Sequence, residues 1–142
     1  MLNVKHTVET TASPAVIWKI WEDVSNWKTW DADLEFSVID GPFAEGTTGS
    51  MKHGGSPVVQ TTLIKVVPLK SFVQIAKLPL ARIIMNHDIT EANGKTYVTF
   101  QLQFRGLLGL FFALHIGREK TKRGLITEMT EMVKKAEGEF PV

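Results

Sequence analysis

Six strand-like segments separated by short turns fill the sequence between residues 34 and 105, and they constrain the fold more than any other feature. Asn93-Gly94, between the last two, is a strong signal for the tight type I′ turn of a β-hairpin. Connections this short join antiparallel neighbours, because parallel strands need a long crossover. We therefore expect a meander of Leu34–Ile39, Gly46–His53, Val58–Val67, Ser71–Leu78, Ala81–Thr90 and Lys95–Arg105.

The segments on either side of this meander add one strand and three helices. Leu2–Thr10 alternates apolar and polar residues, which predicts a seventh strand. Ser13-Pro14 is typical of a helix start, and a second short helix or turn holds Trp27 and Trp30. Apolar residues between Leu107 and Ala136 recur at helical spacing, which predicts one long amphipathic helix.

This order of elements predicts an α+β fold. We expect a curved seven-stranded antiparallel sheet with two short helices and a long C-terminal helix across its concave face. Side chains cannot fill all of the space between such a sheet and helix, so a cavity is expected.

Composition is typical of a globular protein, with 44% hydrophobic and 22% charged residues, and predicts one domain over residues 1–142. The net charge of +1 lacks the basic excess of a nucleic-acid binder. The absence of cysteine excludes disulfides, thiolate metal sites and thiol nucleophiles. The longest apolar run, Leu107–Ile116, is too short to span a bilayer, so a cytoplasmic location is expected.

Several motifs are each weak, but their order along the sequence indicates a family. They are Ser13-Pro14, Trp27-x-x-Trp30-Asp31, Gly41-Pro42 followed by Glu45-Gly46-Thr47, Phe104 to Gly109, and Lys122-Arg123-Gly124-Leu125. With these motifs the sequence resembles the polyketide cyclase/dehydrase and lipid-transport group of the START-like (SRPBCC) superfamily. The resemblance implies the helix-grip fold. Its members include carriers, receptors, cyclases, hydrolases and co-chaperones, so the fold alone does not decide among these functions.

Histidine is the polar residue type that stands out on the expected inner surface. Strand alternation turns His53 and His87 inward, and His6 and His115 also lie among apolar neighbours. A histidine titrates near neutral pH and can therefore act as a general base. His87 and His53 are the candidate catalytic residues. The alternative is that each histidine is a hydrogen-bonded core or rim residue.

We interpret the chain as a binder of a small hydrophobic ligand of lipid, polyketide or aromatic type. Trp21 and Trp30 are placed at the pocket mouth, with anchoring of the short helices as the alternative. A cyclase or dehydratase with a histidine base and a protein-interaction module are the competing functions. The expected ligand-binding residues are Trp21, Trp30, Met51, His53, Met85, His87, Phe100, Phe104, Phe111, Phe112 and His115.

No metal or cofactor is expected, because paired-histidine spacings and phosphate-binding or dinucleotide-binding motifs are absent from the sequence. Asp31 and Asp33, or Glu35, are interpreted as the end of the second short helix, with pairing near the pocket as the alternative. The chain is expected to be a monomer or a homodimer. A basic run is interpreted as a solvated helix face, so membrane contact is at most transient: Arg118, Lys120, Lys122 and Arg123.

Overall fold

The computed structural model describes residues 2–107 and 117–138. Its centre is a seven-stranded antiparallel sheet with the strand order β1-β7-β6-β5-β4-β3-β2. This confirms the predicted sheet, and the ends of four strands coincide with the predicted ones. The strands are β1 (Leu2–Thr10), β2 (Leu34–Ile39), β3 (Thr48–His53), β4 (Val59–Val67), β5 (Ser71–Leu78), β6 (Ala81–Ala92) and β7 (Lys95–Arg105).

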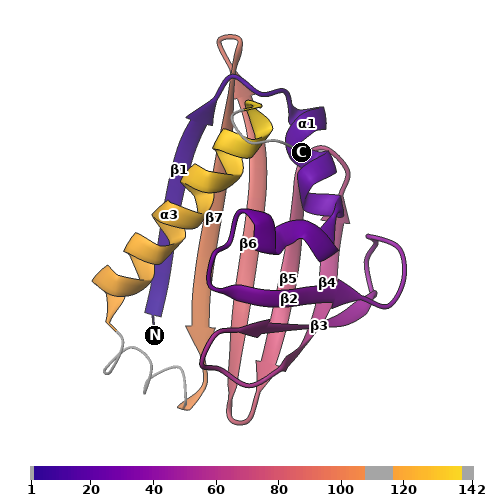
Figure 1. Cartoon of the computed structure of the whole chain (residues 1–142), viewed down its shortest axis with the longest axis vertical. Helices are drawn as coiled ribbons and strands as arrows, with labels where there is room; N and C mark the ends of the chain where they lie inside the picture. Colours follow the sequence, from indigo (N-terminus) through magenta and orange to yellow (C-terminus); the bar gives the residue numbers. More distant parts are fainter. Residues whose placement is uncertain (1, 108–116, 139–142) are drawn as a thin grey trace.

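The sheet curls over on itself. In Figure 1, β2 and β3 cross in front of the long strands β4–β6. The pairing register shifts between Leu34 and Phe36 and again between Leu63 and Lys65. Irregularities of this kind bend a strand and increase its local twist. The curl creates a concave face, and the helices cover that face.

In the described part of the chain, three helices accompany the sheet: α1 (Pro14–Glu22), the 3-10 helix η1 (Val24–Thr29) and α3 (Arg118–Ala136). The Ser13 side chain accepts a hydrogen bond from the backbone N–H of Val16, as a helix N-cap does. The long helix begins at Arg118, not within the stretch that starts at Leu107. Gly117 has φ +82°, which no residue inside an α-helix adopts. The prediction of one unbroken helix is therefore wrong at Gly117.

Aromatic side chains fill the space under α1 and the C-terminal half of α3. Trp21 is fully buried and its ring meets Phe72 edge to face, with centroids 5.1 Å apart. Its indole N–H lies 3.1 Å from the Met132 sulfur on α3. The Trp27 indole N–H donates to the Trp21 carbonyl at 3.0 Å, which joins η1 to α1. Both short helices are thereby fixed to the same part of the sheet.

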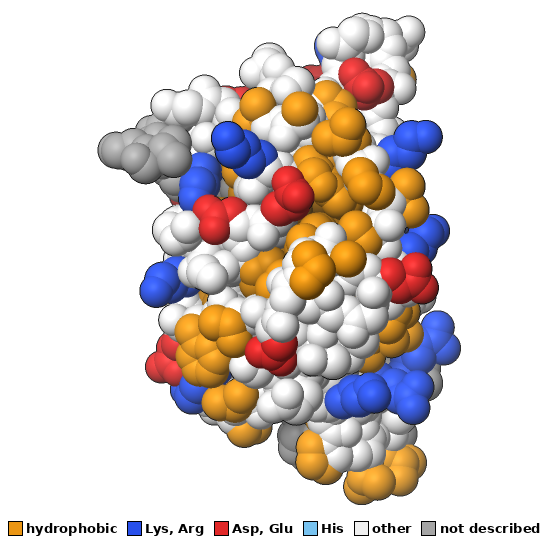
Figure 2. Space-filling model, turned by 90° about the vertical axis from the view of Figure 1, so that its right-hand side faces the viewer, with side chains coloured by type: hydrophobic (Ala, Val, Ile, Leu, Met, Phe, Trp, Pro, Cys, Tyr) orange, Lys and Arg blue, Asp and Glu red, His pale blue; other side chains and the backbone are white. Residues whose placement is uncertain are grey.

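One side of the molecule carries a band of hydrophobic side chains bordered by charged ones (Figure 2). Exposed apolar side chains of α1, β2 and β4 include Val16, Val38 and Ile64, each 41% exposed. No helix in the described part of the chain is both long and apolar enough to cross a membrane.

Close backbone contact at Gly49 gives a test of the β2–β3 pairing. A Cβ at this position would lie 2.1 Å from the carbonyl oxygen of Val38. We expect Gly49→Ala to lower the free energy of unfolding by about 1–3 kcal/mol, because the two strands must separate. Gly124→Ala on α3 is the control: its Cβ would meet nothing within 4 Å, so removing a helical glycine should stabilise by about 0.5–1 kcal/mol. Chemical denaturation followed by circular dichroism measures both, and equal stabilities of the two variants would contradict the assigned pairing.

Candidate functional site

A cavity of about 420 Å³ lies between the concave face of the sheet, the segment after η1, and α3. Its walls are mainly apolar. The apolar lining residues are Trp27, Trp30, Leu34, Met51, Pro57, Val59, Ala76, Leu78, Ile83, Met85, Phe100, Leu102, Phe104 and Leu125. The polar lining residues are Asp31, Asp33, His53, Ser56, Gln74, His87, Thr121 and Glu128.

Strand register brings the sheet residues of this cavity together. Gln74 of β5 is paired with Met85 of β6, and Met85 is paired with Leu102 of β7. His87 of β6 is likewise paired with Phe100 of β7. Paired residues point to the same face of a sheet, and every second residue follows them. The alternation in the sequence therefore placed this part of the lining on its correct face.

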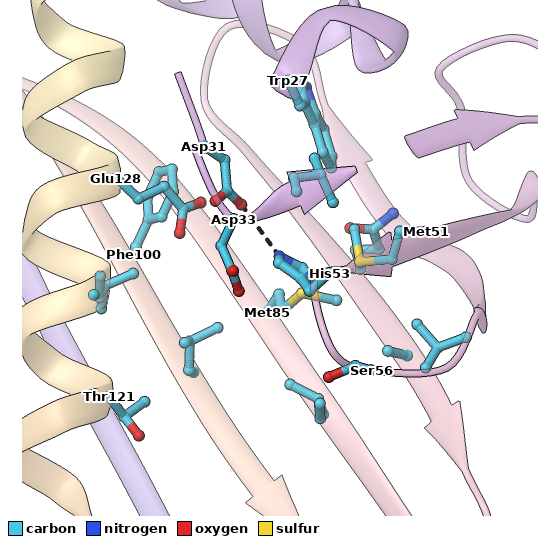
Figure 3. A pocket seen from close by; sticks show the side chains of 18 of the residues that line it. Trp27, Asp31, Asp33, Met51, His53, Ser56, Met85, Phe100, Thr121 and Glu128 are labelled. Atoms are coloured by element: carbon cyan, nitrogen blue, oxygen red, sulfur yellow. Dashed lines mark hydrogen bonds and ion pairs between the residues drawn. The ribbon is translucent and has the colours of Figure 1, made fainter. Parts of the chain in front are cut away.

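At the rim of the cavity, His53 and Asp31 form a pair. The His53 Nε2 and Asp31 Oδ2 atoms are 3.2 Å apart (Figure 3). Two backbone hydrogen bonds hold the segment that carries Asp31. The Asp31 N–H donates to the Trp27 carbonyl at 2.9 Å, and the Gly54 N–H donates to the Asp33 carbonyl at 2.8 Å. The hydrogen bond to Asp31 raises the pKa of His53; burial opposes this, and the charges of Asp31 and Asp33 add to it.

His87 is buried in the cavity wall and differs from His53 in its contacts and in the direction of its pKa shift. Its ring stacks on Phe72 with centroids 3.9 Å apart and meets Phe100 edge to face at 4.4 Å. Burial lowers the pKa of His87 to about 3, while the nearby backbone of Phe72 and Met85 raises it by less. The imidazole is therefore neutral at physiological pH, and it is a weak base.

Three buried polar atoms of the lining have no hydrogen-bond partner among the described residues: Trp30 Nε1, Gln74 Oε1 and His87 Nδ1. Each belongs to a side chain whose residue is at most 8% exposed. Buried polar groups are nearly always paired, and leaving one unpaired costs about 1–3 kcal/mol. All three line the same cavity, so a molecule inside it could pair with them.

Glu128 extends from α3 toward Asp31 (Figure 3). Burial raises the pKa of Glu128 well above its ordinary value, and the charge of Asp31 raises it further. Glu128 is half-buried and lines the cavity. Within residues 2–107 and 117–138, its carboxyl group forms no hydrogen bond or ion pair, and no three His, Asp or Glu side chains converge to hold a metal ion.

Most of the residues expected to bind ligand line this cavity: Trp30, Met51, His53, Met85, His87, Phe100 and Phe104. Trp21 does not lie at a pocket mouth, because its contacts with Phe72 and Met132 bury it in the core. The remaining three, Phe111, Phe112 and His115, lie outside the described residues. Of the other histidines, His6 is half-buried on β1 and is not a lining residue.

Gln74 and Glu128 are among the lining residues that the sequence analysis missed, and it gave Asp31 and Asp33 a different main role. The sequence pattern contains an indication for both Gln74 and Glu128. Gln74 occupies the buried register of β5 between Phe72 and Ala76, and Glu128 lies within the apolar stripe of α3. A polar residue in an apolar register indicates a cavity or a buried partner. Glu35, by contrast, pairs with Lys52 away from the cavity.

Comparisons with solved structures show the same fold in proteins of low sequence identity. The Aha1 dimer from Colwellia psychrerythraea has a TM-score of 0.70 at 17% identity, over 96% of this chain and 97% of that one. A hypothetical protein from Helicobacter pylori has a TM-score of 0.78 at 9% identity, over 94% and 87%. The di-domain ARO/CYC StfQ of the steffimycin biosynthetic pathway has a TM-score of 0.75 at 9% identity; the match covers 97% of this chain and 52% of StfQ.

At such identities the structural likeness establishes the fold alone. No curated protein matches the sequence. The model of the family described as polyketide cyclase/dehydrase and lipid transport matches residues 1–137, which is nearly the whole chain. The chain therefore belongs to the polyketide cyclase/dehydrase and lipid transport family.

Proposed function

We propose that this protein binds a small, mainly apolar molecule in the cavity between the sheet and α3. The observation that carries the proposal is an apolar space of about 420 Å³ whose lining includes three buried polar atoms without partners in the part of the chain that the structure describes. Ligand pockets in proteins typically measure about 300–1,000 Å³ and combine apolar walls with a few polar groups. Membership of a family named for lipid transport and polyketide chemistry supports the same function.

The polar atoms indicate how such a ligand is oriented. Gln74 and His87 lie on neighbouring strands of the same face, and Trp30 follows η1 on the opposite wall. A ligand with one polar group near the β5–β6 wall would pair with Gln74 or His87. The remainder would contact Met51 and Met85, whose flexible side chains adapt to different apolar shapes. A lipid-, polyketide- or aromatic-type molecule meets these requirements.

Filling the cavity with protein should abolish binding. We expect Met85→Trp to weaken the binding of Nile red, a neutral apolar dye, by at least about tenfold, because the indole would occupy the ligand's space. Ile84→Trp is the matched control, since Ile84 is the adjacent residue on β6 and points to the other face of the sheet. Dye fluorescence at increasing protein concentration measures both affinities.

Equal losses in the two variants, or full binding by Met85→Trp, would contradict the location of the site. Native mass spectrometry of the freshly purified wild-type protein complements this test. A mass that is present in the native spectrum and absent after denaturation would supply the formula of a natural ligand.

A second candidate function, a cyclase or dehydratase, is favoured by the pairing of His53 with Asp31. A histidine oriented by a carboxylate is the usual arrangement of a general base. His53 would take a proton from a carbon next to a carbonyl group, and the electron pair would move onto the carbonyl oxygen. The unpartnered N–H of Trp30 is available to that oxygen. His87 is a poor base for this step, because burial lowers its pKa to about 3.

The two histidines should titrate differently in an NMR experiment. We expect His53 to titrate above 6.5, and His87 to remain neutral down to about pH 4.5. Asp31→Asn should lower the pKa of His53, because it removes the hydrogen-bonded carboxylate. Asp33→Asn is the control and should lower it less, since Asp33 acts on His53 through charge alone.

The raised pKa of His53 also makes the free energy of unfolding depend on pH. Since folding raises the pKa of His53, the stabilisation from its pair with Asp31 is complete below pH 6.5 and is lost as the pH rises through the folded-state pKa. Asp31→Asn should flatten this part of the pH–stability curve. A His87 signal that titrates near 6.5, or a His53 pKa that is unchanged in Asp31→Asn, would refute the assignment.

A further inference from the structure

The described lining of the cavity is acidic. It contains the carboxyl groups of Asp31, Asp33 and Glu128, and it contains no lysine or arginine. The two histidines do not balance these groups: His53 is paired with Asp31, and His87 is neutral. An apolar pocket with this charge distribution disfavours an anionic ligand, because a further negative charge would be buried among carboxyl groups.

The geometry around Glu128 is more specific than the overall charge. Its carboxyl group extends from α3 toward that of Asp31, with no partner among the described residues (Figure 3). Two carboxyl groups that face each other in a buried site repel unless a proton or a cation lies between them. Burial and the charge of Asp31 raise the pKa of Glu128, which is the direction expected for such a pair.

A second, independent observation points to a donor-rich ligand. Gln74 Oε1 is an acceptor that has no partner within residues 2–107 and 117–138; Gln74 is 2% exposed and lines the same cavity. The carboxyl oxygens of Asp31, Asp33 and Glu128 add further acceptors, which outnumber the one unpartnered N–H of Trp30 in the described lining. A protonated amine supplies three N–H donors and no acceptor, which matches this surplus.

We propose that the ligand is an apolar molecule carrying a protonated basic nitrogen, and that this nitrogen sits between the carboxyl groups of Asp31 and Glu128. The inference rests on the proposed binding function and adds the chemical class of the ligand. An ammonium group in this position relieves the repulsion between the carboxyl groups and forms charge-assisted hydrogen bonds with them. A fatty acid of the same size would meet His53, which is already paired with Asp31, and no lysine or arginine in the described lining.

Three probes of nearly equal shape test the inference by isothermal titration calorimetry at about pH 7. They are 1-naphthylmethylamine, which is cationic, 1-naphthalenemethanol, which is neutral, and 1-naphthoate, which is anionic. We expect the amine to bind at least about tenfold more tightly than the alcohol, since its hydrogen bonds are to charged groups. The carboxylate should bind most weakly.

Glu128→Gln isolates the proposed contact, because it preserves the shape of the side chain and removes its charge. It should reduce the preference for amine over alcohol to about threefold or less. Glu131→Gln is the matched control on the same helix, since Glu131 pairs with Lys134 and does not line the cavity. It should retain the full preference.

The outcomes separate this inference from the proposed function. Binding of the alcohol as tightly as the amine by the wild-type protein would overturn the inference and leave the binding function in place. An amine preference that survives in Glu128→Gln would also overturn it. If none of the three probes binds, the inference fails, and Nile red then decides whether the binding function fails with it.

Discussion

The burial of Trp21 is the constraint on which the rest of the structure depends. Its side chain contacts the sheet through Phe72 and the C-terminal helix through Met132, and its backbone carbonyl accepts the hydrogen bond that holds η1. A buried tryptophan contributes a large apolar area and a directed N–H at once. With the helices fixed at this end of the concave face, the other end stays open, and there the segment after η1, the end of β3 and the first half of α3 surround unfilled space.

The same cavity holds two histidines in opposite states, and the difference comes from their surroundings. His53 lies at the rim beside a carboxylate, which stabilises the protonated form. His87 is stacked against Phe72 without a charged neighbour, so burial stabilises the neutral form. Environment, and not residue type, assigns acid–base roles in a site. The neutral ring contributes packing and a hydrogen-bonding atom to the cavity wall.

The sheet could be predicted from the sequence, because a strand with one buried face alternates with period two and glycine or proline punctuates its turns. That logic located the concave-face residues Met85, His87 and Phe100. Helical periodicity was less decisive: it predicted a helix running through Gly117, whose backbone conformation is not helical, and α3 begins after this residue. Glu128 was missed because periodicity identifies the inward stripe of a helix without indicating whether that stripe meets a packed core or a cavity. The contact of Asp31 with His53 depends on the curl of β2 and β3, and local sequence does not encode such a contact.

The position of Gly124 allows the size of the cavity to vary among proteins with this fold. It lies on α3 at the cavity wall, and a Cβ there would have no neighbour within 4 Å. Larger side chains at this position would extend into empty space without displacing the sheet or the aromatic core. The size of the molecule that the cavity admits can therefore change through one helix position, while the elements that maintain the fold stay as they are.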